Sequence, residues 1–243
     1  MTGASTGIGR ELVLQLAQAG VKVAISARSA DKLSELEREH PNLKAFALDV
    51  TDPAAVTQTA HAVRAHLGSI DLVVFNAGVW SPMGAANYDV AAAVQSMNVN
   101  YNGTVLPLQA VMPIMIERKA GHIALVASVA GYRGLAQSAA YAPTKAALIN
   151  LAECLKPDLG RYGVKVSIIN PGFVDTPMTR VNTFPMPFMI TTPDAAARII
   201  TGLKRGRYEI AFPWPTVNFL KLLRLLPNTL YFWLSRMMQP LGD

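Results

Sequence analysis

Cysteine, charged residues and long apolar runs are all scarce in this sequence. Cys154 is the single cysteine among 243 residues, so a disulfide framework is excluded and a reducing compartment is expected. Charged residues make up 16% of the chain, and the lysines and arginines are scattered, which argues against nucleic-acid binding. No secretory signal and no apolar run long enough to span a bilayer is recognisable. We therefore expect a cytoplasmic protein whose net charge of +6 serves an anionic cofactor or an anionic lipid surface.

Apolar residues are plentiful at 51%, and they fall into short β-branched runs that alternate with helical patterns. This alternation predicts an α/β fold in three layers, in which a doubly wound parallel sheet carries helices on both faces. Ligands of such sheets bind beyond the carboxyl ends of the strands. The strands are expected at 21–26, 44–48, 70–75, 122–127, 164–170 and 208–212, and the helices at 7–19, 30–39, 53–67, 88–118, 138–162 and 193–204.

The first nine residues, MTGASTGIG, form a glycine loop that leads into a helical pattern. Gly3, Gly7 and Gly9 would let the backbone turn tightly and approach a pyrophosphate at the helix N-terminus. A flexible N-terminal turn is the alternative for such a loop taken alone. Its place at the start of a long α/β alternation favours a nucleotide site.

Tyr141 and Lys145 stand four residues apart in SAAYAPTKAAL, and Ser128 ends the apolar run HIALVAS thirteen residues before Tyr141. Positions four apart share one face of a helix, so the phenol and the ammonium can meet. A neighbouring ammonium would lower the tyrosine pKa from about 10 and suit the phenol to proton transfer near neutral pH. A Tyr and a Lys that merely share a solvated face remain the alternative.

The sequence resembles the short-chain dehydrogenase/reductase family over residues 2 to about 210. The resemblance rests on the glycine loop together with Ser128, Tyr141 and Lys145. Three further motifs agree in order and spacing: NAG at Asn76–Gly78, NYNG at Asn100–Gly103 and PGFVDT at Pro171–Thr176. The resemblance implies a Rossmann-like catalytic domain, which we place at residues 1–213. Residues 214–243 would be an apolar appendage of the same domain.

The family places a strand directly before the glycine loop, in the middle of the sheet, and only Met1 precedes Thr2 here. Without that strand two neighbouring strands would lack a hydrogen-bonding partner. Either the chain begins downstream of its natural start or the protein tolerates a gap in its sheet, and the cost of unsatisfied backbone groups favours the first.

The resemblance also implies a chemistry, which is hydride transfer between a nicotinamide and a carbonyl/alcohol pair. Tyr141 would be the acid or base, Lys145 would lower its pKa and hold the nicotinamide ribose, and Ser128 would bind the substrate oxygen. Asn100 would hold a water that relays protons to Lys145, although a solvated helix position is its alternative. No metal is expected. The cofactor contacts would be Gly3, Ser5, Thr6, Gly7, Ile8, Gly9, Arg28, Asp49, Val50, Asn76, Ala77, Gly78, Tyr141, Lys145, Pro171, Gly172, Val174 and Thr176.

Cofactor choice depends on the end of the second strand, where a carboxylate would bind the ribose 2′-hydroxyl of NAD. This chain has Arg28, which can pair with a 2′-phosphate through charge-assisted hydrogen bonds. The sequence therefore favours NADP over NAD. Thr6 stands where many NADP-using relatives have a basic residue, which weakens this preference.

The substrate is expected to be an apolar carbonyl or alcohol, because the loop after Thr176 is rich in Met, Phe and Pro. Plain packing of this loop against the domain is the alternative. A nucleotide-binding scaffold or sensor with vestigial chemistry is the alternative function. Relatives imply a homodimer or homotetramer, formed through the helix after Ser138. The candidate pocket-lining residues are Trp80, Val129, Tyr132, Phe173 and Phe184.

The last thirty residues follow the final expected strand and are mostly apolar. Asn218, Lys221 and Arg224 recur every third residue on a narrow polar arc, and leucines cover the remainder. Pro227 then breaks the pattern before an aromatic stretch. Such pieces suit an interfacial helix and are too short to span a bilayer. A membrane surface, a lipid-like substrate and another subunit all remain candidate partners.

Overall fold

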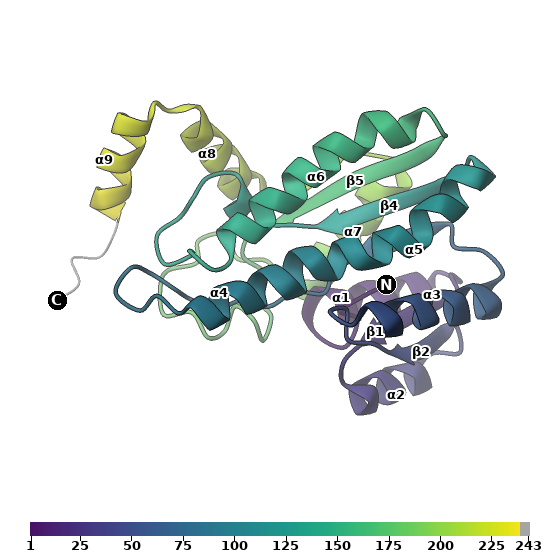
Figure 1. The fold of residues 1–243 in the computed structure, drawn as a ribbon. Helices are drawn as coiled ribbons and strands as arrows, with labels where there is room; N and C mark the ends of the chain where they lie inside the picture. Colours follow the sequence, from purple (N-terminus) through teal and green to yellow (C-terminus); the bar gives the residue numbers. More distant parts are fainter. Residues whose placement is uncertain (239–243) are drawn as a thin grey trace.

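A computed structural model describes residues 1–238 and shows a three-layer, Rossmann-like α/β fold (Figure 1). Within these residues six parallel strands form two sheets, of order β1-β2 and β3-β4-β5-β6. The strands are β1 (Val23–Ala27), β2 (Leu43–Ala47), β3 (Leu72–Phe75), β4 (Gly121–Val126), β5 (Val164–Pro171) and β6 (Glu209–Phe212). The helices around them are α1 (Gly7–Gln18), α2 (Ala30–Glu39), α3 (Pro53–Leu67), α4 (Val90–Met97), α5 (Gly103–Arg118), α6 (Ala142–Gly160) and α7 (Thr192–Lys204).

The first four residues connect the two sheets at their carboxyl ends. The Ser26 amide donates to Met1 O at 2.9 Å, and the Thr2 amide donates to Val74 O at 3.1 Å. Thr2 also forms an isolated parallel bridge with Ser26. Within residues 1–238 no strand lies between β1 and β3 beyond this short bridge, which agrees with the expectation that the strand before the glycine loop is missing.

The sheet is buried on both faces because β4 and β5 alternate their apolar side chains between two layers. Ile123 and Leu125 of β4 pack with α5 and α6, whereas Ala124 and Val126 pack with α1 and α7. Each face therefore has its own apolar cluster. Figure 1 shows α5 and α6 on the near face of the four-stranded sheet and α7 behind it.

The expected helix at 88–118 is wrong as one continuous α-helix. A π-helical turn, η1 (Asn98–Asn102), separates α4 from α5. The helix expected at 138–162 begins only at Ala142, because the segment before it forms a turn and Pro143 suits a first helical turn. The expected helices at 30–39 and 53–67 are confirmed with the same bounds.

Two further helices, α8 (Trp214–Leu225) and α9 (Asn228–Met238), follow the last strand. Val217, Leu220, Leu223 and Tyr231 belong to the same apolar cluster as β4, β5 and α6. The C-terminal segment therefore shares the main core through one side of its helices.

Candidate active site

A cleft of about 350 Å³ opens at the carboxyl ends of the strands, where parallel sheets bind ligands. Both sheets contribute to it, through Arg28 just after β1 and through Ser128 just after β4. Every residue predicted to contact the cofactor lines this cleft, and so does Ser128. Residues that the prediction missed also line it: Ala27, Ser29, Lys32, Leu48, Val79, Val99, Val126, Ala127, Pro177, Met178 and Thr179.

The glycine loop is packed so closely that a side chain has no room. Gly3 has a φ of +65°, and a Cβ there would lie 2.8 Å from the Ala77 backbone. A Cβ on Gly9 would lie 2.1 Å from Gly3 O. The loop leads into α1, and the preceding Thr6 side chain does not cap the helix. The first-turn amides of α1 are thus left for an anion in the cleft, which fits a dinucleotide pyrophosphate.

Asn76 holds the glycine loop in place from the end of β3. Its Nδ2 donates to Gly3 O at 2.8 Å, and its backbone amide donates to the Thr2 hydroxyl at 3.1 Å. The Ala77 amide donates to the same hydroxyl at 3.2 Å. This network ties the loop to β3, so Asn76 shapes the cleft wall as well as lining it.

Tyr141 and Lys145 face the cleft from the start of α6, but their electrostatics differ from the prediction. Burial raises the pKa of Tyr141 to about 12, and a hydrogen bond with the Ser128 hydroxyl opposes the rise. The expected lowering of the Tyr141 pKa by Lys145 is therefore wrong for this structure. The Lys145 Nζ lies 5.3 Å from the Tyr141 ring centre and donates to Val126 O at 2.9 Å. Burial lowers the Lys145 pKa to about 8, because a charge is costly where water is excluded.

Ser128 stands between β4 and the short 3-10 turn η2 (Val129–Gly131). Its Oγ accepts from the Ala130 amide at 3.1 Å and donates to Pro171 O at 3.3 Å. Both contacts fix the hydroxyl beside Tyr141. A substrate oxygen between the two hydroxyls could accept from both if the Ser128 hydrogen turned from Pro171 O toward it.

Asn100 is fully buried on η1, so its alternative as a solvated helix residue is wrong. Its Oδ1 accepts from the Val79 amide at 2.7 Å, and its Nδ2 donates to Val79 O at 3.1 Å and to the Thr144 hydroxyl at 3.0 Å. The side-chain amide thus clamps the chain just after Gly78. Asn100 does not line the cleft, although a Cβ on Gly78 would touch both Asn100 Oδ1 and Lys145 Nζ, at 3.3 and 3.6 Å.

The far end of the cleft from Tyr141 carries two cations. Arg28 follows β1, and Lys32 lies on the first turn of α2, four residues later. Hydrogen bonds from the Thr51 amide and hydroxyl keep the pKa of Asp49 below its usual range, and Arg28 adds to this effect. The prediction named Arg28 and missed Lys32, although the four-residue spacing and helix start were visible in the sequence.

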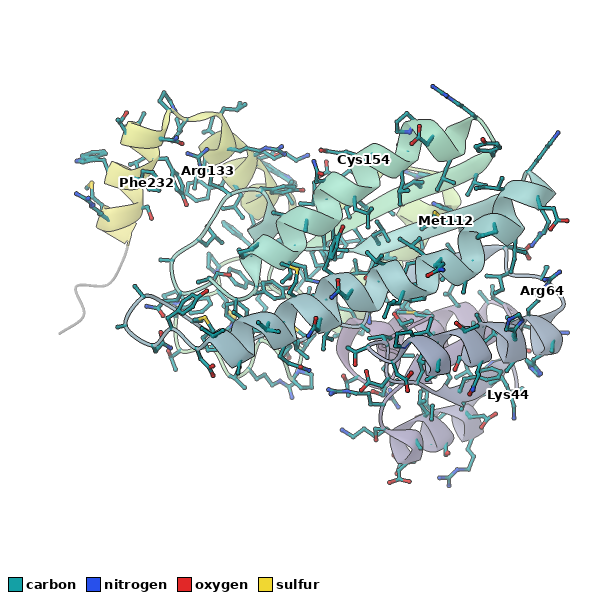
Figure 2. The ribbon with its side chains drawn as sticks, in the orientation of Figure 1. Lys44, Arg64, Met112, Arg133, Cys154 and Phe232 are labelled. Atoms are coloured by element: carbon teal, nitrogen blue, oxygen red, sulfur yellow. The ribbon has the colours of Figure 1, made fainter. Side chains whose placement is uncertain are left out.

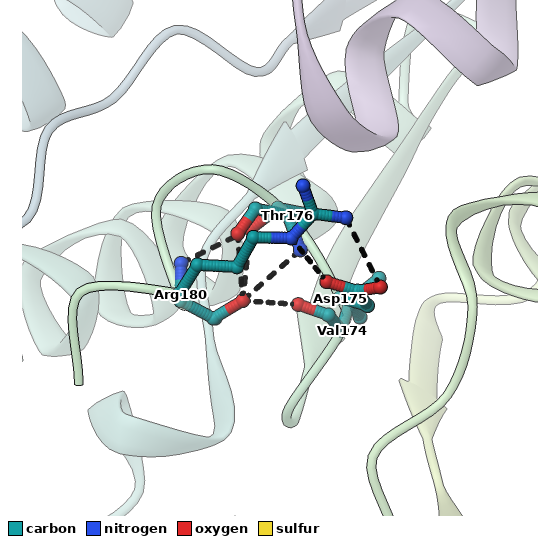
Figure 3. A network of polar contacts seen from close by, with 5 residues as sticks. Val174, Asp175, Thr176 and Arg180 are labelled. Carbon is teal, nitrogen blue, oxygen red and sulfur yellow. Dashed lines mark hydrogen bonds and ion pairs between the residues drawn. The ribbon is translucent and has the colours of Figure 1, made fainter. Parts of the chain in front are cut away.

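A polar network fixes the chain where the PGFVDT motif leaves the cleft (Figure 3). The Thr179 hydroxyl donates to Val174 O at 2.6 Å and lies 3.2 Å from the Thr176 hydroxyl. Arg180 pairs with Asp175 at 2.8 Å. The start of the apolar loop is thereby held against the cleft wall.

The five candidate residues for the substrate pocket divide into an aromatic group and a group in the core cluster. The Trp80 ring stands edge-on to Tyr141 with ring centres 5.0 Å apart, and its Nε1 donates to Asn182 Oδ1 at 2.8 Å. Phe173 and Phe184 contact each other at 6.0 Å between ring centres. Val129 and Tyr132 pack into the apolar cluster around β4 and α6, and neither lines the cleft described above.

No group of three or more His, Cys, Asp or Glu within residues 1–238 is arranged to hold a metal ion. In the same part of the chain, no helix has the length and apolar character needed to cross a membrane.

The sequence matches the family described as short chain dehydrogenase over residues 1–184. It is 40% identical over 235 residues to an uncharacterized oxidoreductase of Myxococcus xanthus, covering 95% of this chain and 93% of the relative. It is also 36% identical over 185 residues to an uncharacterized oxidoreductase of Staphylococcus epidermidis, covering 76% of this chain and 80% of that one.

Two solved structures resemble the whole fold. A short-chain dehydrogenase from Streptomyces avermitilis has a TM-score of 0.82 at 26% identity, covering 99% of this chain and 98% of the other. The closed form of a serine dehydrogenase complexed with NADP+ has a TM-score of 0.82 at 28% identity, covering 88% and 94%. The protein belongs to the short-chain dehydrogenase family, and it is an oxidoreductase that uses a nicotinamide dinucleotide.

Proposed function

We propose that the protein is an NADP-dependent oxidoreductase that interconverts a carbonyl and an alcohol on an apolar small molecule. The observation that carries the proposal is the convergence of Ser128, Tyr141 and Lys145 on the wall of the glycine-loop cleft. The bound nicotinamide would supply or accept the hydride. The protein's own side chains would position the substrate and move the proton.

Tyr141 is the proposed proton donor to the carbonyl oxygen during reduction and the acceptor in the reverse direction. Its raised pKa of about 12 keeps the phenol protonated, which suits donation. Ser128 would hold the same oxygen and stabilise its developing charge. Burial lowers the pKa of Lys145 to about 8, so this side chain can exchange a proton with water near neutral pH.

NADP rather than NAD is supported by the two cations at the far end of the cleft. Arg28 offers a planar donor group to a 2′-phosphate, and Lys32 adds a second positive charge. No carboxylate takes the place of Arg28 directly after β1. The similar serine dehydrogenase, which was solved with NADP+, points the same way.

An apolar substrate is supported by the surroundings of Tyr141. Trp80 covers one side of the phenol, and the loop after Thr176 presents Met178 and Phe184. Apolar walls with two or three polar groups are typical of small-molecule sites.

The test is turnover of a carbonyl panel with NADPH by wild type and by Tyr141→Phe. Loss of the phenol should lower kcat by roughly 10²–10⁴ and leave NADPH affinity nearly unchanged, because the hydroxyl moves the proton while the ring only packs. Tyr162→Phe, on an exposed side chain, is the matched control and should behave as wild type.

A Tyr141→Phe variant that keeps more than a tenth of wild-type kcat would refute the assigned role. Wild type that binds NADPH but turns over no member of the panel would favour a nucleotide-binding scaffold or sensor. The homodimer or homotetramer and the cytoplasmic location stay predictions.

A further inference from the structure

Helix α8 is apolar on both of its faces. Val217, Leu220 and Leu223 are buried in the core cluster. On the opposite side Phe219, Leu222 and Leu225 are 50%, 60% and 79% exposed. A surface helix normally directs polar residues outward, so this outer face lacks the partner that its composition requires.

Helix α9 continues the same apolar surface. Leu230, Phe232, Trp233 and Met237 are all exposed, and Figure 2 shows Phe232 at the end of the molecule opposite Lys44 and Arg64. The other side of α9 is anchored, because the Tyr231 hydroxyl donates to Gly134 O. The exposed aromatic residues therefore belong to a helix that is held in place.

Arg133 reinforces this anchor from the body of the protein. Its guanidinium lies 4.3 Å from the centre of the Tyr231 ring and donates to Asn228 Oδ1 at 2.7 Å. At the other helix, Lys221 of α8 pairs with Glu209 of β6. Both helices are thus fixed to the core by polar contacts as well as by apolar packing.

The charged residues of α8 and α9 themselves are all cations. Between Ile210 and Met238 the sequence has no Asp or Glu, and its cations are Lys221, Arg224 and Arg236. Lys221 is paired, whereas Arg224 and Arg236 are exposed and form no ion pair within residues 1–238. The two helices therefore combine exposed apolar side chains with unneutralised positive charge.

We propose that the outer faces of α8 and α9 bind the surface of an anionic lipid bilayer. Apolar and aromatic side chains beside unpaired arginines are the composition of helices that lie in a membrane interface. With 12 and 11 residues the two helices are too short to cross a bilayer. A second copy of the chain fits less well, because a two-fold contact between these surfaces would bring like charges together.

The start of α8 lies against the wall of the cleft. The Pro213–Thr216 turn packs on Gly172, and a Cβ on Gly172 would lie 3.0 Å from Pro213 Cδ and 3.5 Å from Thr216 Cγ2. The loop before α7, with exposed Val181, Phe184, Phe188 and Met189, lies at the same end of the molecule (Figure 1). A bilayer bound there would face the cleft, which suits an apolar substrate; this last point alone rests on the proposed function.

The test is flotation of the full chain with vesicles of phosphatidylcholine alone and of phosphatidylcholine and phosphatidylglycerol in a three-to-one mixture. Wild type should float with the anionic vesicles, less so at high salt, and hardly with the neutral ones. The variant Leu222→Ser/Leu225→Ser/Phe232→Ser/Trp233→Ser should not float and should stay in the bottom fraction of the gradient. The variant Arg224→Gln/Arg236→Gln should bind anionic vesicles more weakly by roughly five-fold for each arginine.

The matched control is Val21→Ser/Tyr162→Ser, which changes exposed apolar residues elsewhere and should float as wild type does. The arginine variant keeps the test decisive if the serine variant fails to fold. Failure of wild type to float with anionic vesicles overturns the proposal, as does equal loss in the control. A wild-type dimer that the serine variant makes monomeric, without vesicle binding, assigns the surface to a second copy instead. None of these readouts requires turnover, so the result is independent of the proposed function.

Discussion

Arg28 and Lys32 differ from the rest of the cleft in that their only expected contact is with a 2′-phosphate. Arg28→Ala should weaken NADPH binding by roughly ten- to hundred-fold, because a hydrogen bond to a charged group contributes about 1.5–3 kcal/mol. NADH binding should hardly change. Lys32→Ala should have a smaller effect in the same direction, since an ammonium lacks the bidentate fork of arginine.

Fluorescence titration of both cofactors measures this preference, with Lys22→Ala as the control on an exposed lysine outside the cleft. Equal loss of NADPH and NADH affinity in Arg28→Ala would refute the contact between Arg28 and the 2′-phosphate.

Lys145 should make stability depend on pH in the alkaline range. Its pKa is about 8 in the folded protein and 10.5 in the unfolded chain, so the unfolded chain binds more protons between these values. The contribution of Lys145 to stability is therefore fully present above pH 10.5, where the side chain is neutral in both states. It is lost as the pH falls through about 8, the pKa of Lys145 in the folded protein. Relative to Lys145→Met, wild type should gain roughly 2–3 kcal/mol in unfolding free energy between pH 8 and pH 10.

Urea unfolding of both proteins at several pH values measures this difference. A difference that does not change with pH would mean that Lys145 is not desolvated as the structure indicates. The comparison should stay below pH 10, because Tyr141 lowers the stability of the folded state above that pH. Its raised pKa makes the folded state bind more protons than the unfolded chain there.

At the scale of elements, the π-helical turn η1 decides where Asn100 points. Asn100→Ala should leave the amide and the carbonyl of Val79 without their partner, at about 1–3 kcal/mol for each group. The melting temperature should fall by roughly 5–20 °C for a chain of this size. Asn102→Ala, on the same turn but exposed, should melt within a few degrees of wild type.

Thermal unfolding followed by circular dichroism suffices for this comparison. If Asn100→Ala melts like wild type and loses only activity, the side chain acts on the chemistry and not on the clamp at Val79.

At the scale of the whole molecule, the cleft spans a sheet that is divided in two. Residues 1–4 supply the hydrogen bonds between the divided sheets, and a dinucleotide would touch Arg28 beside one sheet and Tyr141 beside the other. NADPH at a hundred times its Kd should stabilise the protein by about 2.7 kcal/mol. Amide hydrogen exchange should slow more in β1 and β2 than in β4, because the smaller sheet gains the most from being bridged.

Exchange measured by mass spectrometry with and without NADPH tests this expectation. Equal slowing across all strands would indicate that the two sheets already unfold as one unit.

The alternation of strands and helices was predictable because it depends on local periodicity. All six expected strands are present, and residues 30–39 and 53–67 form helices with the expected bounds. The motif residues that line the cleft were predictable as well. Each motif follows the end of a strand, and a parallel sheet brings these ends to one edge. These features follow from spacing along the chain, and spacing is what a sequence contains.

The sequence by itself determined the layered α/β fold, the family, and the motif residues that line the cleft. Tertiary structure alone decided the burial of Asn100, the break at η1, and the placing of Val129 and Tyr132 in the core. It also decided that burial, opposed by a hydrogen bond with Ser128, raises the Tyr141 pKa, and that α8 buries one apolar face and exposes another. Such properties depend on which groups exclude water from each atom, and that is settled only when distant segments pack together.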